Sequence, residues 1–213
     1  MIKVELIDVW GFEHAVRGMR NPMNSWDRGD SHYSIDHSRF IIGKDDMKLM
    51  QKLYKAGTEH RKYMRQIFIS MDITAPLYWW KEFDTYKFIL PDPLHYDSNS
   101  CSTMHKIHSK EFTMDDFSFE KLVVTHAGKK TAEGLINSLN HFREIYQQTK
   151  SKEYWWQMIQ ALPTAYNQKR TITMNYENSV SIIKQRSGHK LDEWKIFVNE
   201  LSKLPYIQEI TGG

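Results

Sequence analysis

Hydrophobic and polar residues alternate in three segments of the chain, and each alternation predicts a β-strand. At residues 2–6, Ile, Val and Leu alternate with Lys and Glu, which is the pattern of a strand that buries one face. Residues 67–74 repeat the pattern over a longer stretch, and we expect that strand to end at Pro76. A shorter alternation at residues 171–174 predicts another strand.

Apolar residues recur at spacings of three and four in other segments, and this period predicts helices. The clearest stripe begins at Thr131 and runs to Tyr146. The remaining predicted helices cover residues 45–65, where Gly57 interrupts the pattern, residues 153–162, a segment around Val180 that ends near Arg186, and a segment after Lys190.

Residues 11–44 and 88–98 fit neither period, and they are rich in loop-forming residues such as Gly, Asn, Asp, Ser and Pro. We therefore expect irregular loops in both segments. Strands and helices are mixed along the chain, without a repeat or a clear linker. The fold class that follows is α+β with α/β mixing, in which residues 1–213 form a single domain with a mixed sheet flanked by long helices.

The net charge and the cysteine content limit the kinds of partner and the cellular compartment that we expect for this protein. The formal net charge is only +3 and the pI is near 8.8, so the dense basic surface that is typical of proteins binding long nucleic acid is lacking. Cys101 is the only cysteine, which excludes an intrachain disulfide and favours a reducing compartment. The first residues do not resemble a signal peptide, and no apolar run reaches the length of a membrane span. We therefore expect a cytoplasmic protein without membrane association.

Common catalytic motifs are missing from the sequence. It has no glycine-rich phosphate loop of either common type and no nucleophile elbow. His105 and His108 lie near Cys101 at a loosely zinc-like spacing, but a second pair of ligands is lacking, so we expect no metal site. No acid–base pair or nucleophile identifies a reaction by itself.

The most informative segment lies between Leu162 and Trp194. It predicts a short strand, then Asn175 at a strand-to-helix junction, then a helix with Arg186 in its last turn. An Asn at such a junction can cap the helix, and an Arg near a helix C-terminus is favoured by the helix dipole. Both residues therefore have a purely structural interpretation as well as a functional one.

The order of residues in this segment resembles the C-terminal part of the flavin-dependent thymidylate synthases. In that family a Leu-Pro pair is followed by a strand, an Asn and a helix that ends in an Arg. The matching residues here are Leu162-Pro163, Asn175, Arg186, His189 and Trp194. The resemblance implies that Asn175 contacts a flavin and that Arg186 holds a pyrimidine nucleotide and acts in catalysis, for which a guanidinium is suited. Glu177 departs from the pattern, because the family usually has a second Arg there.

A second stretch, residues 55–106, resembles the same family with larger changes. His60 and Pro76 keep the family's separation, and Lys81-Glu82 stand at its Arg-Gln pair. The family's Arg-His-Arg signature is replaced by Thr85-Tyr86-Lys87.

By resemblance, the residues in this stretch that contact the flavin are His60, Thr85, Tyr86 and Lys87, and Glu82 contacts the substrate. Tyr86 is able to stack on a planar ring, and Thr85 is able to donate to a phosphate. For the neighbouring aromatic residues Trp79, Trp80 and Phe83, core packing and ring stacking are equally acceptable interpretations.

After its signature the family shows a motif of Ser and Asn that ends in Arg. Asn99-Ser100-Cys101-Ser102 gives the Asn-x-x-Ser part, and Met104 stands at the Arg, which His105 or Lys106 can replace after a small shift. The resemblance implies that Asn99 contacts the cofactor and that Ser100 and Ser102 bind the substrate, with Ser102 also acting in catalysis. Hydroxyls and a cation near a turn make a phosphate cradle, but they equally make an ordinary serine-rich loop.

Members of this family transfer a one-carbon unit from methylenetetrahydrofolate to C5 of dUMP and reduce it with the hydride of FAD, which NADPH recharges. The resemblance therefore implies FAD as cofactor, dUMP or a related pyrimidine nucleotide as partner, and a homotetramer. Two alternatives stay open. One is an enzyme that modifies another pyrimidine deoxynucleotide, and the other is a non-catalytic protein that binds nucleotides or nucleic acid.

Overall fold

The computed structural model of the chain describes residues 1–86, 97–102 and 104–212. Contacts divide these residues into two compact units. Unit 1 contains residues 1–4, 72–86, 98–102 and 104–171, and unit 2 contains residues 5–71, 97 and 172–212. Helices and strands are mixed in both units, which confirms the predicted α+β class.

A four-stranded sheet with the order β1-β4-β6-β5 is the main β-structure. Its strands are β1 (Lys3–Trp10), β4 (Phe68–Pro76), β6 (Asn167–Asn175) and β5 (Asp97–Ser100). The first three confirm the strands expected from alternation, although β6 is longer than the predicted segment. A separate antiparallel pair in unit 2 consists of β2 (His32–Tyr33) and β3 (Phe40–Ile41).

Burial differs between β4 and β1. On β4, Ile69, Met71 and Ile73 are at most 1% exposed, as the alternation predicts for a strand within a sheet. For β1, the prediction that one face of the strand is buried is wrong beyond the first residues of the strand, because Leu6 and Ile7 are 46% and 54% exposed. Among the strands that the structure describes, β1 lies at the edge of the sheet and pairs only with β4.

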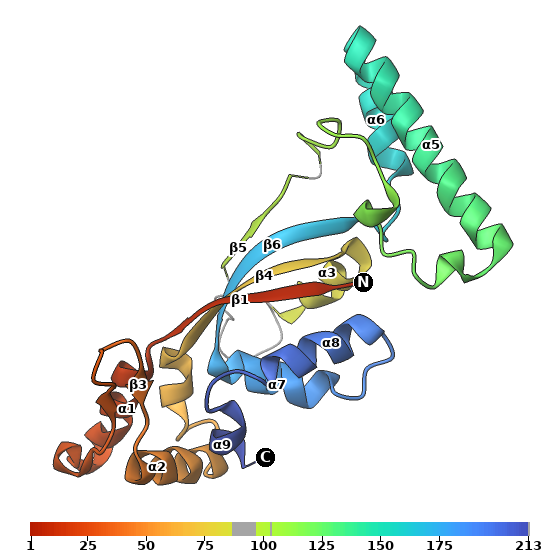
Figure 1. Ribbon diagram of the computed structural model, residues 1–213. Helices are drawn as coiled ribbons and strands as arrows, with labels where there is room; N and C mark the ends of the chain where they lie inside the picture. The colour runs from red at the N-terminus through yellow and green to blue at the C-terminus, as the bar shows by residue number, and fades with distance from the viewer. Residues whose placement is uncertain (87–96, 103, 213) are drawn as a thin grey trace. The chain divides into compact units, whose positions relative to one another are not determined.

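Unit 1 contains two helices that lie side by side, α5 (His126–Thr149) and α6 (Lys152–Ala161) (Figure 1). α5 begins five residues before the predicted start at Thr131, where the Thr125 hydroxyl accepts a hydrogen bond from the Gly128 amide. The other short elements of this unit are α3 (Leu77–Phe83), η4 (Met114–Asp116) and η5 (Leu122–Val124). The apolar core between them consists of Ile107, Phe112, Phe117, Phe119, Ala132, Ile136, Leu139 and Met158.

Unit 2 is largely helical. Its longer helices are α1 (Phe12–Arg20), α2 (Lys44–Lys55), α7 (Tyr176–Arg186), α8 (Asp192–Leu201) and α9 (Ile207–Thr211), and its single-turn helices are η1 (Asn21–Met23), η2 (Trp26–Arg28) and η3 (Lys62–Gln66). α7 packs beside α8, and α2 packs beside α9 (Figure 1). The break expected at Gly57 is confirmed, because α2 ends just before this residue, which has a positive φ of 107°.

The prediction that residues 11–44 form an irregular loop is wrong. α1 occupies the start of the segment and buries Phe12, Ala15 and Met19 on one face. Gly11 permits this helix to begin, because its φ is +94° and a side chain there would lie 2.0 Å from the Gln66 carbonyl oxygen. The predicted loop at 88–98 lies outside the described residues, except that Asp97 and Ser98 belong to β5.

A buried ion pair orders the rest of the 11–44 segment. Arg20 Nε lies 2.6 Å from Asp46 Oδ1, and both side chains are almost fully buried. Asp46 Oδ2 accepts hydrogen bonds from the Ser31 hydroxyl at 2.6 Å and from the Asp30 and Ser31 amides. Asp30 in turn accepts from the Asp46 amide at 3.0 Å. Because both partners of the pair are hydrogen-bonded, the burial of two charges is compensated.

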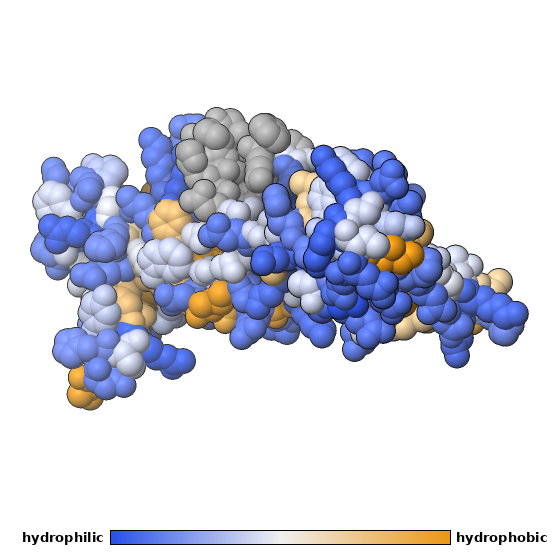
Figure 2. Space-filling view, turned by 90° about the horizontal axis from the view of Figure 1, so that it is seen from above, coloured by the Kyte–Doolittle hydropathy of each residue, from blue (hydrophilic) through white to orange (hydrophobic). Residues whose placement is uncertain are grey.

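On the face that Figure 2 shows, hydrophilic residues predominate and hydrophobic residues form small separate patches. Large apolar side chains that are exposed include Trp10, Trp26 and Trp156. In the part of the chain that the structure describes, no helix combines the length and the hydropathy needed to cross a membrane.

Candidate functional site

The start of α7 is fixed by several hydrogen bonds. Asn175 caps the helix, since its side-chain oxygen accepts from the Asn178 amide at 3.0 Å, which confirms the capping interpretation. The Tyr176 amide donates to the Ile67 carbonyl at 2.9 Å, and the Tyr176 hydroxyl donates to the Pro205 carbonyl at 2.8 Å. Burial raises the pKa of the Tyr176 hydroxyl well above its ordinary value, so this donor stays protonated.

The cap occupies only part of the Asn175 side chain. Its Nδ2 group makes no hydrogen bond with the residues that the structure describes, and the residue is only half-buried. The amide group therefore retains two donor hydrogens for a ligand. Capping and ligand contact are compatible roles for this residue.

Glu177 forms a bidentate ion pair with Arg61. Its carboxylate oxygens lie 2.7–3.0 Å from Arg61 Nε and Nη2, and the Arg61 and Glu177 side chains are 14% and 11% exposed. Arg61 also lies over the Tyr54 ring at 5.2 Å. Glu177 stands where the family usually has an Arg, so the charge at this position is reversed and Arg61 neutralises it.

This ion pair connects the first turn of α7 to the turn that carries His60. The His60 amide donates to the Gly57 carbonyl at 3.1 Å, and Arg61 follows it in the chain. The His60 side chain is exposed. The structure therefore brings the turn that contains His60 close to the first turn of α7. This proximity is required if His60 and Asn175 are to contact the same ligand.

Arg186 lies at the other end of α7. Its guanidinium carbon is 4.5 Å from the centroid of the Trp194 ring, which is fully buried. His189 meets the same ring edge-on at 6.0 Å, and its Nδ1 accepts from the Leu191 amide at 3.2 Å. Stacking on an indole fixes the plane of a guanidinium. Asn175 and Arg186 are eleven residues apart, which corresponds to about 16 Å along a helix.

The first two residues of the altered signature, Thr85 and Tyr86, follow α3 in unit 1, and their side chains are engaged within the protein. The Thr85 hydroxyl donates to the Glu82 carbonyl at 2.6 Å, so its proton is already used. Tyr86 is only 2% exposed and packs near Phe83, which leaves no open ring face for stacking. Lys87 lies outside the described residues.

The aromatic residues of α3 are core residues. Trp79, Trp80 and Phe83 are at most 1% exposed and pack on one another at 4.9–5.5 Å. Trp80 Nε1 donates to the Gln168 carbonyl at 2.9 Å, and Arg170 covers the Trp80 ring at 4.3 Å. The core interpretation of these rings is confirmed.

The turn that follows β5 is held in place by β6. The Cys101 amide donates to the Lys169 carbonyl, and Gln168 Nε2 donates to the Cys101 carbonyl, both at 3.0 Å. The Ser102 oxygen accepts from the His105 amide at 2.9 Å and lies 3.2 Å from His105 Nδ1. Asn99 and Ser100 are exposed on β5.

A cavity of about 340 Å³ opens beside Ser102. Its polar lining includes Lys106, Ser109 and Lys110. An ion pair with Asp116 raises the pKa of the Lys110 ammonium, whereas Lys106 is exposed and has no ion-pair partner among the described residues. Hydroxyls and ammonium groups together form a donor set that suits a phosphate.

The sequence identified Ser102 and Lys106 but missed Ser109 and Lys110. The signal was present, because Lys106 and Lys110 are four residues apart on either side of Ile107, which is buried. The predicted site residues fall into two groups. His60, Asn175 and Arg186 belong to unit 2, and Glu82, Thr85, Tyr86, Asn99, Ser100 and Ser102 belong to unit 1. Among the described residues, no cluster of three or more His, Cys, Asp or Glu could hold a metal ion.

Comparison of the sequence with known families and curated proteins found no match: no protein-family model matches the chain, and no curated protein does.

Comparison of folds gives a clear result. The chain is similar to a crystal structure of thymidylate synthase X from Helicobacter pylori with FAD and dUMP, with 14% identity and a TM-score of 0.68 over 99% of this chain and 97% of that chain. A second structure of the flavin-dependent enzyme from Helicobacter pylori, also complexed with FAD and dUMP, gives 14% identity and a TM-score of 0.67 over 98% and 97%. The chain therefore has the fold of the flavin-dependent thymidylate synthases.

Proposed function

We propose that this protein is a flavin-dependent thymidylate synthase-like enzyme that methylates dUMP reductively to dTMP. Its co-substrates are methylenetetrahydrofolate and NADPH, its cofactor is FAD, and it acts as a cytoplasmic homotetramer. The observation that carries the proposal is the likeness in fold, over nearly the whole chain, to structures that contain FAD and dUMP. The resemblance of the segment from Leu162 to Trp194 supports it independently of that likeness.

The donor chemistry of unit 2 fits a flavin. An isoalloxazine ring has carbonyl and nitrogen acceptors along one edge, and the Asn175 amide and the exposed His60 ring are able to donate to them. When bound, FAD supplies the hydride that reduces the transferred one-carbon unit. At the altered signature the fit is poorer, because Thr85 and Tyr86 are engaged within the protein. Cofactor contacts are therefore assigned first to His60 and Asn175.

Arg186 is the residue that we assign to the pyrimidine ring. Its guanidinium carbon lies 4.5 Å from the centroid of the buried Trp194 ring, so the indole restricts where this cation can lie. A charged donor that is already in place stabilises negative charge that develops on a ring carbonyl during reaction at C5. Arg186 therefore both orients the nucleotide and lowers the barrier.

The cavity beside Ser102 is assigned to the phosphate of the nucleotide. Lys106 supplies a cation that has no carboxylate partner among the described residues, and Ser102 supplies a hydroxyl. Ser100, which we also expect at the substrate, is exposed on the neighbouring strand β5. Lys110 adds a second cation, although Asp116 neutralises it in part. Glu82, which we expect at the substrate, is half-buried.

Two measurements on the purified protein test the proposal. The protein should take up FAD and show the visible absorption of a flavin, and it should release the C5 proton of dUMP when reduced flavin and methylenetetrahydrofolate are present. A protein that stays colourless after incubation with FAD and releases no proton would refute the proposal. If the protein takes up FAD but releases no proton, it is a flavoprotein and dUMP is not its substrate.

The reversed charge at Glu177 favours a second candidate, an enzyme that acts on another pyrimidine deoxynucleotide. Where the family has a cation, this chain has a carboxylate bound to Arg61, so its contacts near the start of α7 differ from the family pattern. Thermal-shift measurements with dUMP, dCMP and UMP separate the candidates. Stabilisation by dUMP above the other two would reject the second candidate, and stabilisation by dCMP would favour it.

A further inference from the structure

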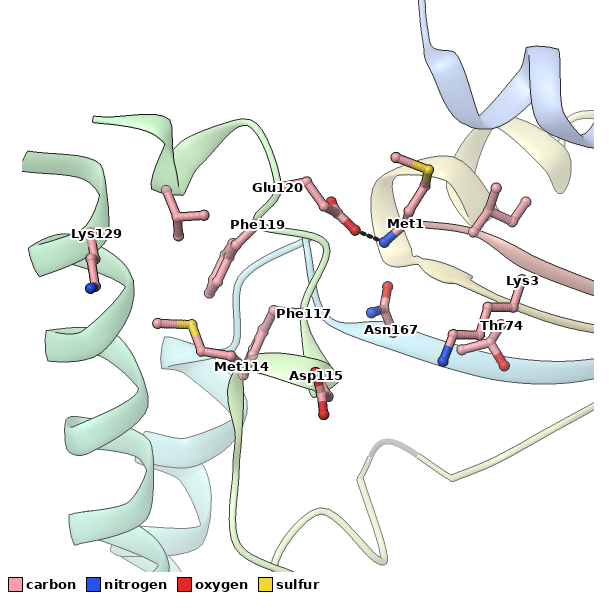
Figure 3. A pocket seen from close by; sticks show the side chains of 12 residues that line it. Met1, Lys3, Thr74, Met114, Asp115, Phe117, Phe119, Glu120, Lys129 and Asn167 are labelled. Atoms are coloured by element: carbon pink, nitrogen blue, oxygen red, sulfur yellow. Dashed lines mark ion pairs between the residues drawn. The ribbon is translucent and has the colours of Figure 1, made fainter. Parts of the chain in front are cut away.

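Unit 1 contains a cavity of about 810 Å³ that none of the proposed roles uses. Its size falls within the range of pockets that enclose small organic ligands. Figure 3 shows that side chains from the sheet form one wall, and that side chains from the segment before α5, together with Lys129 of α5, form the other. The two walls differ in chemistry.

The wall formed by the sheet presents hydrogen-bond donors. Lys3 on β1, Thr74 on β4 and Asn167 on β6 all line the cavity. Among the described residues, the Lys3 ammonium and the Thr74 hydroxyl have no hydrogen-bond partner. The Ser118 hydroxyl donates to Asn167 Oδ1 at 2.8 Å, which leaves the Asn167 amide hydrogens as donors. Three neighbouring strands therefore place an ammonium, a hydroxyl and an amide on one wall.

The opposite wall is apolar. Met114, Phe117 and Phe119 line it, and the two phenyl rings are stacked at 4.9 Å with their planes within 3° of each other. Phe117 and Phe119 belong to the core of unit 1, so packing holds the two rings in place. The two rings are only 4% and 7% exposed, so the 38% exposed side chain of Met114, with its flexible thioether, supplies the larger part of the apolar contact for a flat body.

Charge in the cavity favours an anion. Two acids line the cavity, and one of them, Glu120, is paired with the Met1 amino group (Figure 3). Asp115 is exposed at the rim and is the remaining acid of the lining, against the cations of Lys3 and Lys129. With Glu120 neutralised, the lining carries a net positive charge.

We propose that this cavity is a binding site for a small organic anion with a flat apolar body, of the class of aromatic carboxylates. The carboxylate lies against Lys3, Thr74 and Asn167, and the apolar body lies on Met114 and the stacked rings. The proposal is independent of the function proposed above, because its residues differ from those assigned to FAD and dUMP.

Binding of 2-naphthoate to the full-length protein tests the site, with methyl NMR of ¹³C-labelled methionines as readout. The Met114 methyl lines the cavity, and its resonance is identified with Met114→Leu. The fully buried Met50 methyl of unit 2 serves as the internal control. We expect a saturable shift of the Met114 resonance, with the Met50 resonance unchanged.

The charge requirement is tested with a neutral ligand and two variants. The alcohol 2-naphthalenemethanol should bind about fivefold more weakly than 2-naphthoate, because an exposed ion pair contributes about 1 kcal/mol. Lys3→Gln should weaken naphthoate binding by about the same factor. Lys152→Gln removes an exposed cation of α6 away from the cavity and should leave the affinity unchanged.

Several results would overturn the proposal. The first is the absence of a saturable shift of the Met114 resonance. The second is that the protein binds 2-naphthoate and 2-naphthalenemethanol with equal affinity, or that wild type and Lys3→Gln bind 2-naphthoate with equal affinity. Displacement of naphthoate by FAD or dUMP would assign the cavity to the proposed active site instead. A shift at Met114 that follows protein concentration without ligand, with dimers in sedimentation, would identify the cavity as an interface between copies of the chain.

Discussion

The two groups of predicted site residues match the pattern of the flavin-dependent thymidylate synthases to different degrees. In unit 2, Asn175 and Arg186 retain the residue types of the family, and polar groups near them are held by a cap, an ion pair and a stacked indole. In unit 1, Thr85 is bonded within its own turn and Tyr86 is buried. Cations are found instead at Lys106 and Lys110, beside Ser102.

The difference illustrates two ways in which a protein can accommodate a change in its charged residues. A lost cation can be replaced by another cation from a neighbouring turn, because a phosphate accepts hydrogen bonds from many directions. A reversed charge within a packed region needs a direct partner, because an unpaired buried carboxylate is costly. In unit 1, Lys106 and Lys110 supply cations beside Ser102, and in unit 2 Arg61 pairs directly with Glu177. The predictions below test this distinction, beginning with the largest expected effect.

The largest effect is expected from Arg186→Ala, if unit 2 holds the intact part of the site. The variant should lower kcat/KM for dUMP by a factor of about 10²–10³, as the loss of one preorganised charged donor does in other enzymes. FAD uptake should be retained. C5-proton release is the measurement, and Lys184→Ala, which removes another cation from the same helix, is the matched control. Equal activity of Arg186→Ala and wild type would contradict the assignment.

Glu177→Ala should reduce the free energy of unfolding by about 2–3 kcal/mol, because Arg61 would keep a largely buried charge without its partner. Urea denaturation measures the effect. Lys203→Ala removes an exposed pair with Glu200 and should change stability by at most about 0.5 kcal/mol. The exchange of both charges, Arg61→Glu with Glu177→Arg, should recover most of the loss. If the double variant is no more stable than Glu177→Ala, direct pairing is not the reason for the arrangement.

Asn175 allows capping and ligand contact to be separated. Asn175→Ala should cost about 1 kcal/mol of stability because the α7 cap is lost. Asn175→Asp keeps an oxygen for the cap but removes the amide donor, so stability should stay near wild type while FAD affinity falls. Thermal denaturation and flavin titration measure the two properties. Unchanged FAD affinity in Asn175→Asp would restrict this residue to capping.

The smallest effect is expected in unit 1, where the charge is shared among several groups. Lys106→Gln should raise the Kd for dUMP about fivefold, which corresponds to about 1 kcal/mol for one exposed cation. Binding of deoxyuridine, which has no phosphate, should not change. Lys130→Gln on α5 is the matched control. A loss of affinity for both ligands would show that Lys106 does not act through the phosphate.

Much of the fold follows from local pattern in the sequence. The strand β4 and the helices α6 and α8 were predicted because their apolar residues share one face over several turns or pleats. α1 was missed because Gly, Asn and Arg around it are typical of loops. Its signal was nevertheless present, since Phe12, Ala15, Val16 and Met19 recur at helical spacing.

The contacts of the candidate site residues were harder to predict from the sequence, because they join segments that are far apart in the chain. Arg61 and Glu177 are 116 residues apart, and no local pattern pairs them. The burial of Tyr86 depends on the packing around α3, so the sequence left both core and stacking roles open for its neighbours. Asn175 and Arg186 were identified because a whole ordered motif, rather than one residue, carried the resemblance.

The ion pair between Arg61 and Glu177 also restricts how this protein can evolve. Replacing either residue alone leaves an unpaired charge inside a packed region. We therefore expect selection against a substitution at either position unless the other position changes with it. Among close relatives, an acid at position 177 should therefore occur with Arg at position 61, and Arg at position 177 should occur without it. Such paired variation would show that the contact between the two side chains constrains both positions together.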